Sequence, residues 1–229
     1  MSTRPTSLIV FDCDGTLVDS QHAIVASMAH AYATVGLPCP SRDKVLSIVG
    51  LSLPECFEVL SPEQDLATRA ELAQLYKSGN VWKTAADRVH DPLYDGAHAL
   101  VTALAGRDDV VLGVATGKSR RGVARLLERE GWHGHFVTIQ TADDHPSKPH
   151  PSMLLQAMAE TGIAPGRTLM IGDTAYDMHM ARNAQVTAIG VTWGYHAHAH
   201  LLDAGAHGIA HTFDELSRHI ETRHAAQET

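Results

Sequence analysis

Two aspartates stand two positions apart in the segment Asp12-Cys13-Asp14-Gly15-Thr16. Side chains two apart on an extended chain point the same way, so both carboxylates are expected to face one crevice. Carboxylates this close repel each other unless a cation or a shared proton lies between them. The pair therefore points to chemistry that uses a bound cation, proton transfer, or both.

A calcium-binding loop can open with the same Asp-x-Asp-Gly pattern. An EF-hand loop needs a bidentate Glu eleven residues after its first Asp, and that position here is Ala23. The segment before Asp12 is also strand-like rather than helical, so the calcium interpretation fails. Cys13 points away from the crevice and is expected to be a packed, unreactive thiol.

A second polar segment, Thr116-Gly117-Lys118-Ser119, follows the apolar run 110–116. A hydroxyl beside free backbone N–H groups at the start of a helix favours anion binding. The preceding glycine is Gly113, which leaves three residues between the glycines instead of four, so the phosphate-loop pattern is not met. Taken alone, the segment is typical of an ordinary strand–turn–helix with a Ser cap.

The third polar segment contains Gly172-Asp173-Thr174 and, one helical turn further on, Asp177. Acidic residues at the start of a helix most often complement its dipole. Lys148 lies in a proline-bracketed loop, Ser147-Lys148-Pro149-His150-Pro151. Each of these signals is weak alone, and they gain weight only if the fold brings them together.

The elements between these segments predict such a fold. Apolar runs typical of buried strands cover 7–11, 110–116, 136–141, 168–173 and 186–192, and helix-period segments cover 122–131, 151–162 and 175–184. Strands alternating with helices predict an α/β fold with a doubly wound, mostly parallel sheet. Ligands bind outside the carboxyl ends of such strands, so the polar segments are expected to share one site.

Residues 19–92 show helical patterns and no convincing strand. This stretch is too long for a crossover helix, so we predict a helical domain inserted into the sheet domain. The expected division is a core domain of residues 1–18 and 93–229 and a cap domain of residues 19–92, with hinges near 17–20 and 91–96.

Composition limits the partners. Eighteen Lys and Arg against 26 Asp and Glu give a formal charge of −8, which disfavours nucleic acid and anionic membranes. Three scattered cysteines, Cys13, Cys39 and Cys56, are typical of a reducing compartment. With no membrane-length apolar run and no signal-peptide core, we expect a cytoplasmic monomer or homodimer that acts on a small molecule.

In this order and at these spacings, the segments resemble the haloacid dehalogenase superfamily of phosphotransferases. Within it, the chain is most similar to phosphoglycolate phosphatases and their near relatives. The stretches that carry the resemblance are FDCDGTLVDS, SIVGLSL, SKPHP and GDTAYDMHMARNAQVTAIGVTWGYH, within residues 8–216. The resemblance implies a Rossmann-like core, an α-helical cap placed after the first motif, and Mg²⁺-dependent phosphoryl transfer.

The resemblance also implies roles for individual residues. Asp12 is the implied nucleophile, which forms an aspartyl-phosphate, and Asp14 is the implied general acid and base. The residues assigned to the substrate are Gly15, Thr16, Thr116, Gly117 and Lys148, with Thr116 and Lys148 on the phosphoryl oxygens. Those assigned to Mg²⁺ are Asp12, Asp14 through its backbone carbonyl, Asp173 and, as support, Asp177.

The expected activity is hydrolysis of a small phosphate monoester of the phosphoglycolate type. An inorganic pyrophosphatase and a phosphosugar phosphatase or mutase stay open as alternatives, and a non-catalytic phosphate-binding module is a remote one. A dehalogenase is disfavoured, because displacing a halide needs neither a leaving-group acid nor a metal. A phosphonatase would need a Schiff-base lysine from the insert, and none stands in a recognisable setting.

Two sets of residues receive a plainer interpretation. The run His196-x-His198-x-His200 suggests a metal cluster, but a solvated loop or helix start is the better reading in a chain with 16 histidines. Arg42 and Lys44 are the cations nearest the SIVGLSL segment, and we expect both to be solvated.

Overall fold

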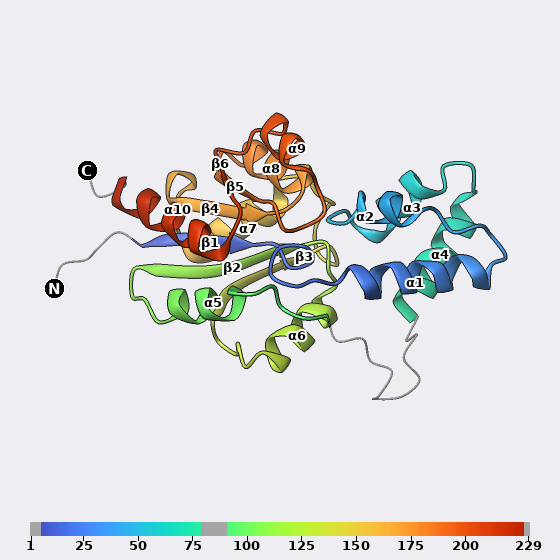
Figure 1. Ribbon diagram of the computed structural model, residues 1–229, viewed down its shortest axis with the longest axis horizontal. Coiled ribbons are helices and arrows are strands. Elements are labelled where there is room, and N and C mark those ends of the chain that lie inside the picture. The colour runs from blue at the N-terminus through green and yellow to red at the C-terminus, as the bar shows by residue number, and fades with distance from the viewer. Residues whose placement is uncertain (1–5, 79–90, 227–229) are drawn as a thin grey trace.

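The computed structural model describes residues 6–78 and 91–226, without the side chains of 224–226. Its centre is a six-stranded, wholly parallel sheet in the order β3-β2-β1-β4-β5-β6 (Figure 1). The strands are β1 (Ser7–Phe11), β2 (Val110–Thr116), β3 (Phe136–Thr141), β4 (Thr168–Gly172), β5 (Thr187–Val191) and β6 (Gly208–Ala210). The predicted α/β, doubly wound sheet is confirmed, and β6 is a strand that the apolar runs did not indicate.

Alternate residues of the strands feed two hydrophobic cores, one on each face of the sheet. Ile9 and Phe11 of β1 pack into one core, and Leu8 and Val10 into the other. The first core is covered by α5 (Ala97–Ala105), α6 (Arg120–Arg129) and α10 (Phe213–Ala226). The second is covered by α7 (Ser152–Thr161), α8 (Ala175–Asn183) and α9 (His198–Asp203). Burial on both faces explains why the strands are continuous apolar runs.

Local signals set the ends of the helices that surround the site. The Ser119 hydroxyl accepts the Gly122 N–H at 3.2 Å and caps the start of α6. Helix α7 ends at Gly162, whose φ of 69° is the left-handed conformation that a glycine adopts without strain. A short 3-10 helix (Pro165–Arg167) then leads into β4.

The insert after β1 forms a helical lobe beside the sheet, at the right of Figure 1. Its helices are α1 (Gln21–Thr34), α2 (Arg42–Leu46), α3 (Leu53–Leu60) and α4 (Leu66–Ser78). They share a hydrophobic core of their own, which includes Met28, Tyr32, Phe57 and Leu72. Residues 79–90 lie outside the described chain, so the domain limits at 18/19 and 92/93 stay a prediction.

The two connections between the lobes run side by side. The Asp19 N–H donates to the Pro92 carbonyl at 2.8 Å, and the Tyr94 N–H donates to the Leu17 carbonyl at 3.0 Å. Val18 and Leu93 form an antiparallel bridge between these hydrogen bonds. The predicted hinge segments therefore lie against each other.

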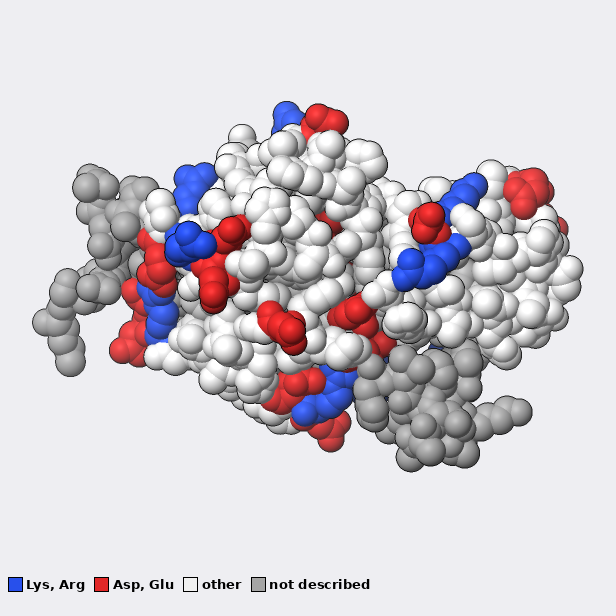
Figure 2. Space-filling model, viewed as in Figure 1, with Lys and Arg blue, Asp and Glu red and all other residues white. Residues whose placement is uncertain are grey.

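The thiols and the surface charges agree with the composition. Cys13 is buried, and burial raises the pKa of its thiol, so it is the packed group that the pattern predicts. On the face seen in Figure 2, acidic and basic side chains lie in small groups of both signs instead of one basic patch. Within the described chain, we find no helix with both the length and the apolar character needed to span a membrane.

Candidate active site

Strand order brings the predicted site residues to the centre of the sheet. The chain leaves β1 for β2 and β3 on one side, and β4, β5 and β6 follow on the other, so the order reverses between β1 and β4. A crevice at the carboxyl ends of the strands is expected at such a reversal. Asp12 directly follows β1, and Asp173 directly follows β4. The two residues therefore flank this crevice.

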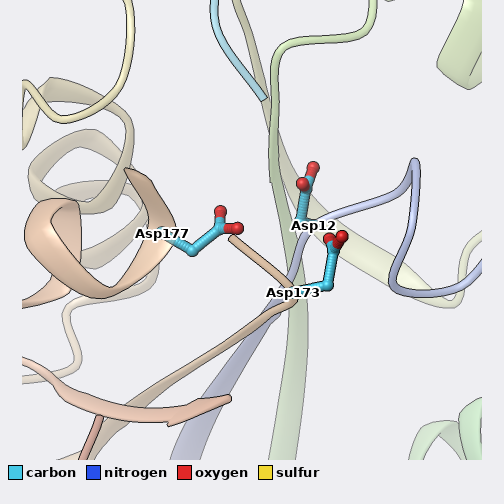
Figure 3. Close-up of side chains that lie close together, drawn as sticks. All are labelled: Asp12, Asp173 and Asp177. Atoms are coloured by element: carbon cyan, nitrogen blue, oxygen red, sulfur yellow. The ribbon is translucent and has the colours of Figure 1, made fainter. Parts of the chain in front are cut away.

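Asp12, Asp173 and Asp177 point toward one another at this crevice (Figure 3). One carboxylate oxygen from each lies within 4.8 Å of the other two, and all three residues are buried. Asp177 comes from the first turn of α8, which begins at Ala175, three residues after the last residue of β4. The sequence-predicted carboxylates thus form one cluster, with the exception of Asp14.

The loop after β1 fixes Asp173. The Thr16 hydroxyl donates to Asp173 Oδ1 at 3.0 Å, and the Tyr195 N–H donates to Oδ2 at 2.8 Å. Gly15 has a φ of 82°, and a Cβ there would lie 2.2 Å from Asp173 Oδ2. Glycine is required at this position both for the turn and for the close approach of the carboxylate.

Lys148 lies between two carboxylates of the cluster. Its Nζ is 2.6 Å from Asp177 Oδ1 and 3.1 Å from Asp12 Oδ1, and its side chain is fully buried. The other Asp177 oxygen accepts the Thr174 N–H at 3.1 Å and the Thr174 hydroxyl at 2.7 Å. Asp177 therefore caps α8 and anchors the lysine at the same time. Burial lowers the pKa of Lys148, but the charges of Asp12 and Asp177 outweigh it and keep the pKa raised.

Asp12 has one engaged and one open oxygen. Oδ1 accepts the Cys13 N–H at 2.7 Å and faces Lys148, whereas buried Oδ2 has no hydrogen-bond partner among the described residues. The pKa of Asp12 is raised to about 6, because burial and then the Asp177 charge raise it by more than the Lys148 charge lowers it. The pKa of Asp173 is also well above its ordinary value, because of burial and then its neighbours Asp177 and Asp12.

These residues fit a hard divalent cation. Three ionised carboxylates beside one ammonium leave two negative charges uncompensated in a buried space, which is costly unless a dication or protons neutralise them. Asp12 Oδ2 is a buried oxygen still in need of a partner. Carboxylate oxygens are the ligands that hard divalent cations prefer. Asp12, Asp173 and Asp177 are the residues that would hold such an ion.

Asp14 lies apart from the cluster and has a lysine of its own. Its Oδ1 is 2.6 Å from Lys118 Nζ, and the two side chains are 14 % and 21 % exposed. Burial lowers the pKa of Lys118, but the Asp14 charge and hydrogen bond outweigh it, so the pKa is raised. The implied metal contact through the Asp14 backbone carbonyl stays a prediction. The pairing with Lys118 is a feature that sequence reasoning missed.

The segment after β2 meets both Asp12 and the insert. Buried Thr116 lies beside Asp12, where its hydroxyl lowers the pKa of that carboxyl, and it accepts the Lys118 N–H at 3.2 Å. A Cβ on Gly117 would lie 2.8 Å from the Leu51 carbonyl oxygen and 2.9 Å from that of Gly50. The loop that precedes α3 therefore presses directly against the end of β2.

Further contacts hold the same part of the insert on the core. The Ser52 N–H donates to the Ser147 hydroxyl at 2.8 Å, one residue before Lys148. His196 departs from the predicted solvated state, because it is half-buried and its Nδ1 accepts the Ala175 N–H at 3.1 Å. This leaves Nε2 to donate its proton to the Ser47 carbonyl of the insert, 3.0 Å away. The other two histidines of the run are exposed, as expected.

Two further sets of residues lie outside the carboxylate cluster. Arg42 and Lys44 are exposed on α2, as predicted, and Arg42 hydrogen-bonds to Gln21. The segment after β5 lies at the site, where the Trp193 ring N–H donates to the Thr16 carbonyl at 2.9 Å. The only sequence signal for this contact is the position of Trp193 after a strand end.

Comparison with known proteins assigns the chain to a family. The profile described as haloacid dehalogenase-like hydrolase matches residues 9–191. The chain belongs to this family. The resemblance predicted from the motifs, and with it the hydrolase class, is therefore confirmed.

The relatives of this hydrolase extend over nearly the whole chain. The probable phosphatase IndB of Dickeya dadantii is 35 % identical over 216 residues, which cover 91 % of each chain. The pyrophosphatase PpaX of Bacillus velezensis is 31 % identical over 201 residues, 84 % of this chain and 86 % of its own. A phosphoglycolate phosphatase of Agrobacterium fabrum is 31 % identical over 201 residues, 85 % and 84 % of the two chains. Among solved structures, a predicted phosphatase from Clostridium acetobutylicum has a TM-score of 0.83 at 27 % identity, covering 95 % of this chain and 99 % of its own.

Proposed function

We propose that this hydrolase is a Mg²⁺-dependent phosphatase that cleaves a small phosphate monoester through an aspartyl-phosphate on Asp12. The observation that carries the proposal is the open, buried Oδ2 of Asp12, in a carboxylate cluster that also holds a buried lysine. Relatives named as phosphatases, each aligned over most of their length, support the same class of reaction. A cytoplasmic location and a cap domain of residues 19–92 belong to the same proposal.

In the first step, an oxygen of Asp12 attacks the phosphorus of the ester. A bond forms between Asp12 and phosphorus as the bond to the leaving oxygen breaks, and Asp14 gives its proton to that oxygen. Lys148 and Thr116, which both lie beside Asp12, hold the phosphoryl oxygens. Bound Mg²⁺ would neutralise negative charge on the phosphoryl group and on the carboxylates around it.

In the second step, Asp14 takes a proton from a water molecule, whose oxygen attacks the phosphorus of the aspartyl-phosphate. The bond between Asp12 and phosphorus breaks, inorganic phosphate leaves, and the Asp12 carboxylate is restored. The balance is one ester and one water consumed, and one alcohol and one phosphate released. Asp14 serves both steps because it ends the first as a base ready for the second.

The proposed substrate is a small anionic ester of the 2-phosphoglycolate type. An alcohol leaving group needs the proton that Asp14 supplies, and an insert docked on the site favours a small leaving group over a macromolecule. Pyrophosphate is the second candidate, because a pyrophosphatase is among the relatives. Its leaving group gains less from protonation, which places it second.

The test compares kcat/KM for 2-phosphoglycolate, pyrophosphate, phosphosugars and nucleoside monophosphates with Mg²⁺ under one set of conditions. A preference of about 100-fold for another substrate, roughly 2.7 kcal/mol, would overturn the substrate while leaving the phosphatase in place. Absence of Mg²⁺-dependent p-nitrophenyl phosphate hydrolysis would instead favour a non-catalytic phosphate-binding module.

The nucleophile is tested with Asp12→Asn against Asp203→Asn, which changes an exposed carboxyl on α9. We expect the first substitution to abolish turnover and the second to leave it unchanged. Retention of more than a few per cent of the wild-type kcat by Asp12→Asn would refute the nucleophile assignment.

A further inference from the structure

We propose that Lys118 determines specificity by binding a second negative charge on the leaving group of the substrate. This inference rests on the proposed function and narrows its substrate class. The favoured substrates are small phosphate compounds whose leaving group is itself anionic. A carboxylate, as in 2-phosphoglycolate, and the second phosphate of pyrophosphate supply the same chemistry.

The two lysines of the site, Lys148 and Lys118, lie on different sides of it. Lys148 is held between Asp12 and Asp177, on the side where the phosphoryl group is transferred. Lys118 Nζ lies 2.6 Å from Asp14 Oδ1. Since Asp14 protonates the leaving oxygen in the proposed reaction, the ammonium of Lys118 lies on the leaving-group side.

Lys118 is open to a ligand in a way that Lys148 is not. Its side chain is 21 % exposed, whereas that of Lys148 is fully buried. Within the described chain, Asp14 is the one carboxylate within ion-pair distance of Lys118. An ammonium has three N–H donors, so two remain for an incoming anion while Asp14 keeps the third.

The stem of Lys118 is held in place by its own turn. A Cβ on Gly122 would lie 2.9 Å from Lys118 Cγ and 3.3 Å from Cδ and Cε, so the stem runs across the first turn of α6. A glycine within a helix lowers its stability, but the missing Cβ of Gly122 leaves room for the stem of Lys118. The Lys118 N–H is also bonded to the Thr116 hydroxyl at 3.2 Å. The backbone and stem of Lys118 are therefore held in place, which restricts the position of its ammonium group.

Among the described residues, the neighbours of Asp14 other than Lys118 include two neutral phenols and a second acidic residue. Asp14 raises the pKa of Tyr76 and Tyr195, after burial, so both phenols are uncharged near that carboxylate. Asp91 is a second acidic residue close enough to feel the Lys118 charge. Burial raises the pKa of Asp91, and the Lys118 charge lowers it. Arg42 and Lys44, the other candidates, are exposed on α2. Lys118 can therefore offset the repulsion between an anionic leaving group and the carboxylate that Asp14 becomes once it has given up its proton.

A plainer role for Lys118 is to orient Asp14. Loss of that role would slow hydrolysis of every ester to the same degree, whatever the charge on its leaving group. Loss of an anion-binding role would act on anionic leaving groups alone. Pairs of ligands that differ only in this charge therefore separate the two roles.

The first measurement is equilibrium binding of two non-hydrolysable phosphonates, with Mg²⁺, by calorimetry. 3-Phosphonopropionate has the shape of 2-phosphoglycolate and keeps its carboxylate, whereas propylphosphonate ends in a methyl group. We expect wild type to prefer the former by about tenfold or more, equivalent to about 1.4 kcal/mol. Lys118→Met should lose this preference, and the control Lys44→Met should keep it. No preference in wild type, or an unchanged one in Lys118→Met, would overturn the proposal.

The second measurement is kcat/KM for 2-phosphoglycolate, pyrophosphate and ethyl phosphate. Lys118→Met should lose about tenfold or more on the first two substrates and little on ethyl phosphate. Lys118→Arg should restore part of the loss, and Lys118→Gln replaces Met if the latter fails to fold. Equal losses on all three substrates would reduce Lys118 to a positioning residue for Asp14. Failure of wild type to hydrolyse any ester would refute the proposed function alone, because the phosphonate pair needs no turnover.

Discussion

Replacing Asp12 with Asn should stabilise the protein in the absence of metal, and increasingly so as the pH rises. Burial raises the pKa of the Asp12 carboxyl from 3.8 to about 6. A carboxyl whose pKa is higher in the folded state binds its proton more tightly there, so it favours folding when protonated. That contribution is complete below the unfolded pKa and is lost as the pH rises through the folded pKa. Asn has no proton to lose.

The size of the effect follows from the same two values. A rise from 3.8 to about 6 corresponds to about 3 kcal/mol at roughly 1.4 kcal/mol per pH unit. Proton linkage places about 2 kcal/mol of this between pH 4 and pH 8. For a chain of 229 residues, each kcal/mol shifts Tm by roughly 2–4 °C. The Tm of Asp12→Asn relative to wild type should therefore rise by roughly 4–8 °C across this range.

The assay is thermal unfolding, followed by circular dichroism in EDTA at several pH values from 4 to 8. Asp203→Asn serves as the control, because it removes an exposed carboxyl. Its difference from wild type should not change with pH. Added Mg²⁺ at pH 7.5 should raise the Tm of wild type by much more than it raises the Tm of Asp12→Asn, because the variant lacks one ligand of the ion. Lys148 should keep a carboxylate partner in the variant, because its Nζ lies 2.6 Å from Asp177 Oδ1 in wild type.

A difference between Asp12→Asn and wild type that stays constant from pH 4 to pH 8 would refute this reasoning. It would mean that the Asp12 carboxyl titrates alike in the folded and unfolded chains. The buried cluster would then not hold uncompensated charge, and the need for a dication would lose its physical basis.

Three other outcomes test different parts of the site. Gly15→Ala should weaken Mg²⁺ binding and abolish hydrolysis, because its Cβ would lie 2.2 Å from Asp173 Oδ2. The control is Gly131→Ala, which should lower only Tm, because Gly131 has a similar positive φ but open space around the added Cβ. Equal Mg²⁺ affinities in calorimetry of these two variants would exclude the close approach. Lys148→Met should lower kcat by about 100-fold or more in steady-state assays, since a buried charge beside the phosphoryl group is lost; a change under tenfold would contradict that role. EDTA treatment followed by gel filtration should abolish turnover, and added Mg²⁺ should restore it. Ca²⁺ should restore turnover poorly, because it prefers more ligands at longer distances. Full activity after the EDTA treatment would argue against a metal.

The ends of a strand could be predicted to within about one residue where the strand is buried and therefore consists of apolar residues. β1 to β5 lie within the apolar runs because most of their residues are buried between the helices on the two faces of the sheet. β6 was not predicted, because only three residues pair and two of them are half-buried. So short a segment leaves no apolar run to recognise.

The site was predictable as far as backbone topology decides it. Strand ends brought Asp12 and Asp173 together because parallel strands end at one edge of a sheet. Hydrogen bonds between distant side chains could not be predicted in this way. The bond from Thr16 to Asp173 joins residues 157 apart, and that from Lys118 to Asp14 joins residues 104 apart. His196 was misread for the same reason, since its partner Ser47 belongs to the insert.

The position of β1 between β2 and β4 dictates when the site can form during synthesis. β1 pairs with residues from Val110 onward on one edge and from Thr168 onward on the other, so an emerging chain carries an unpaired apolar strand for most of its synthesis. Such unpaired edges are prone to wrong pairing until both neighbouring strands have docked. Asp12 meets Asp173 and Asp177 only after β4 has docked. A cation held by these three carboxylates would therefore bind only after β4 and the start of α8 have joined β1.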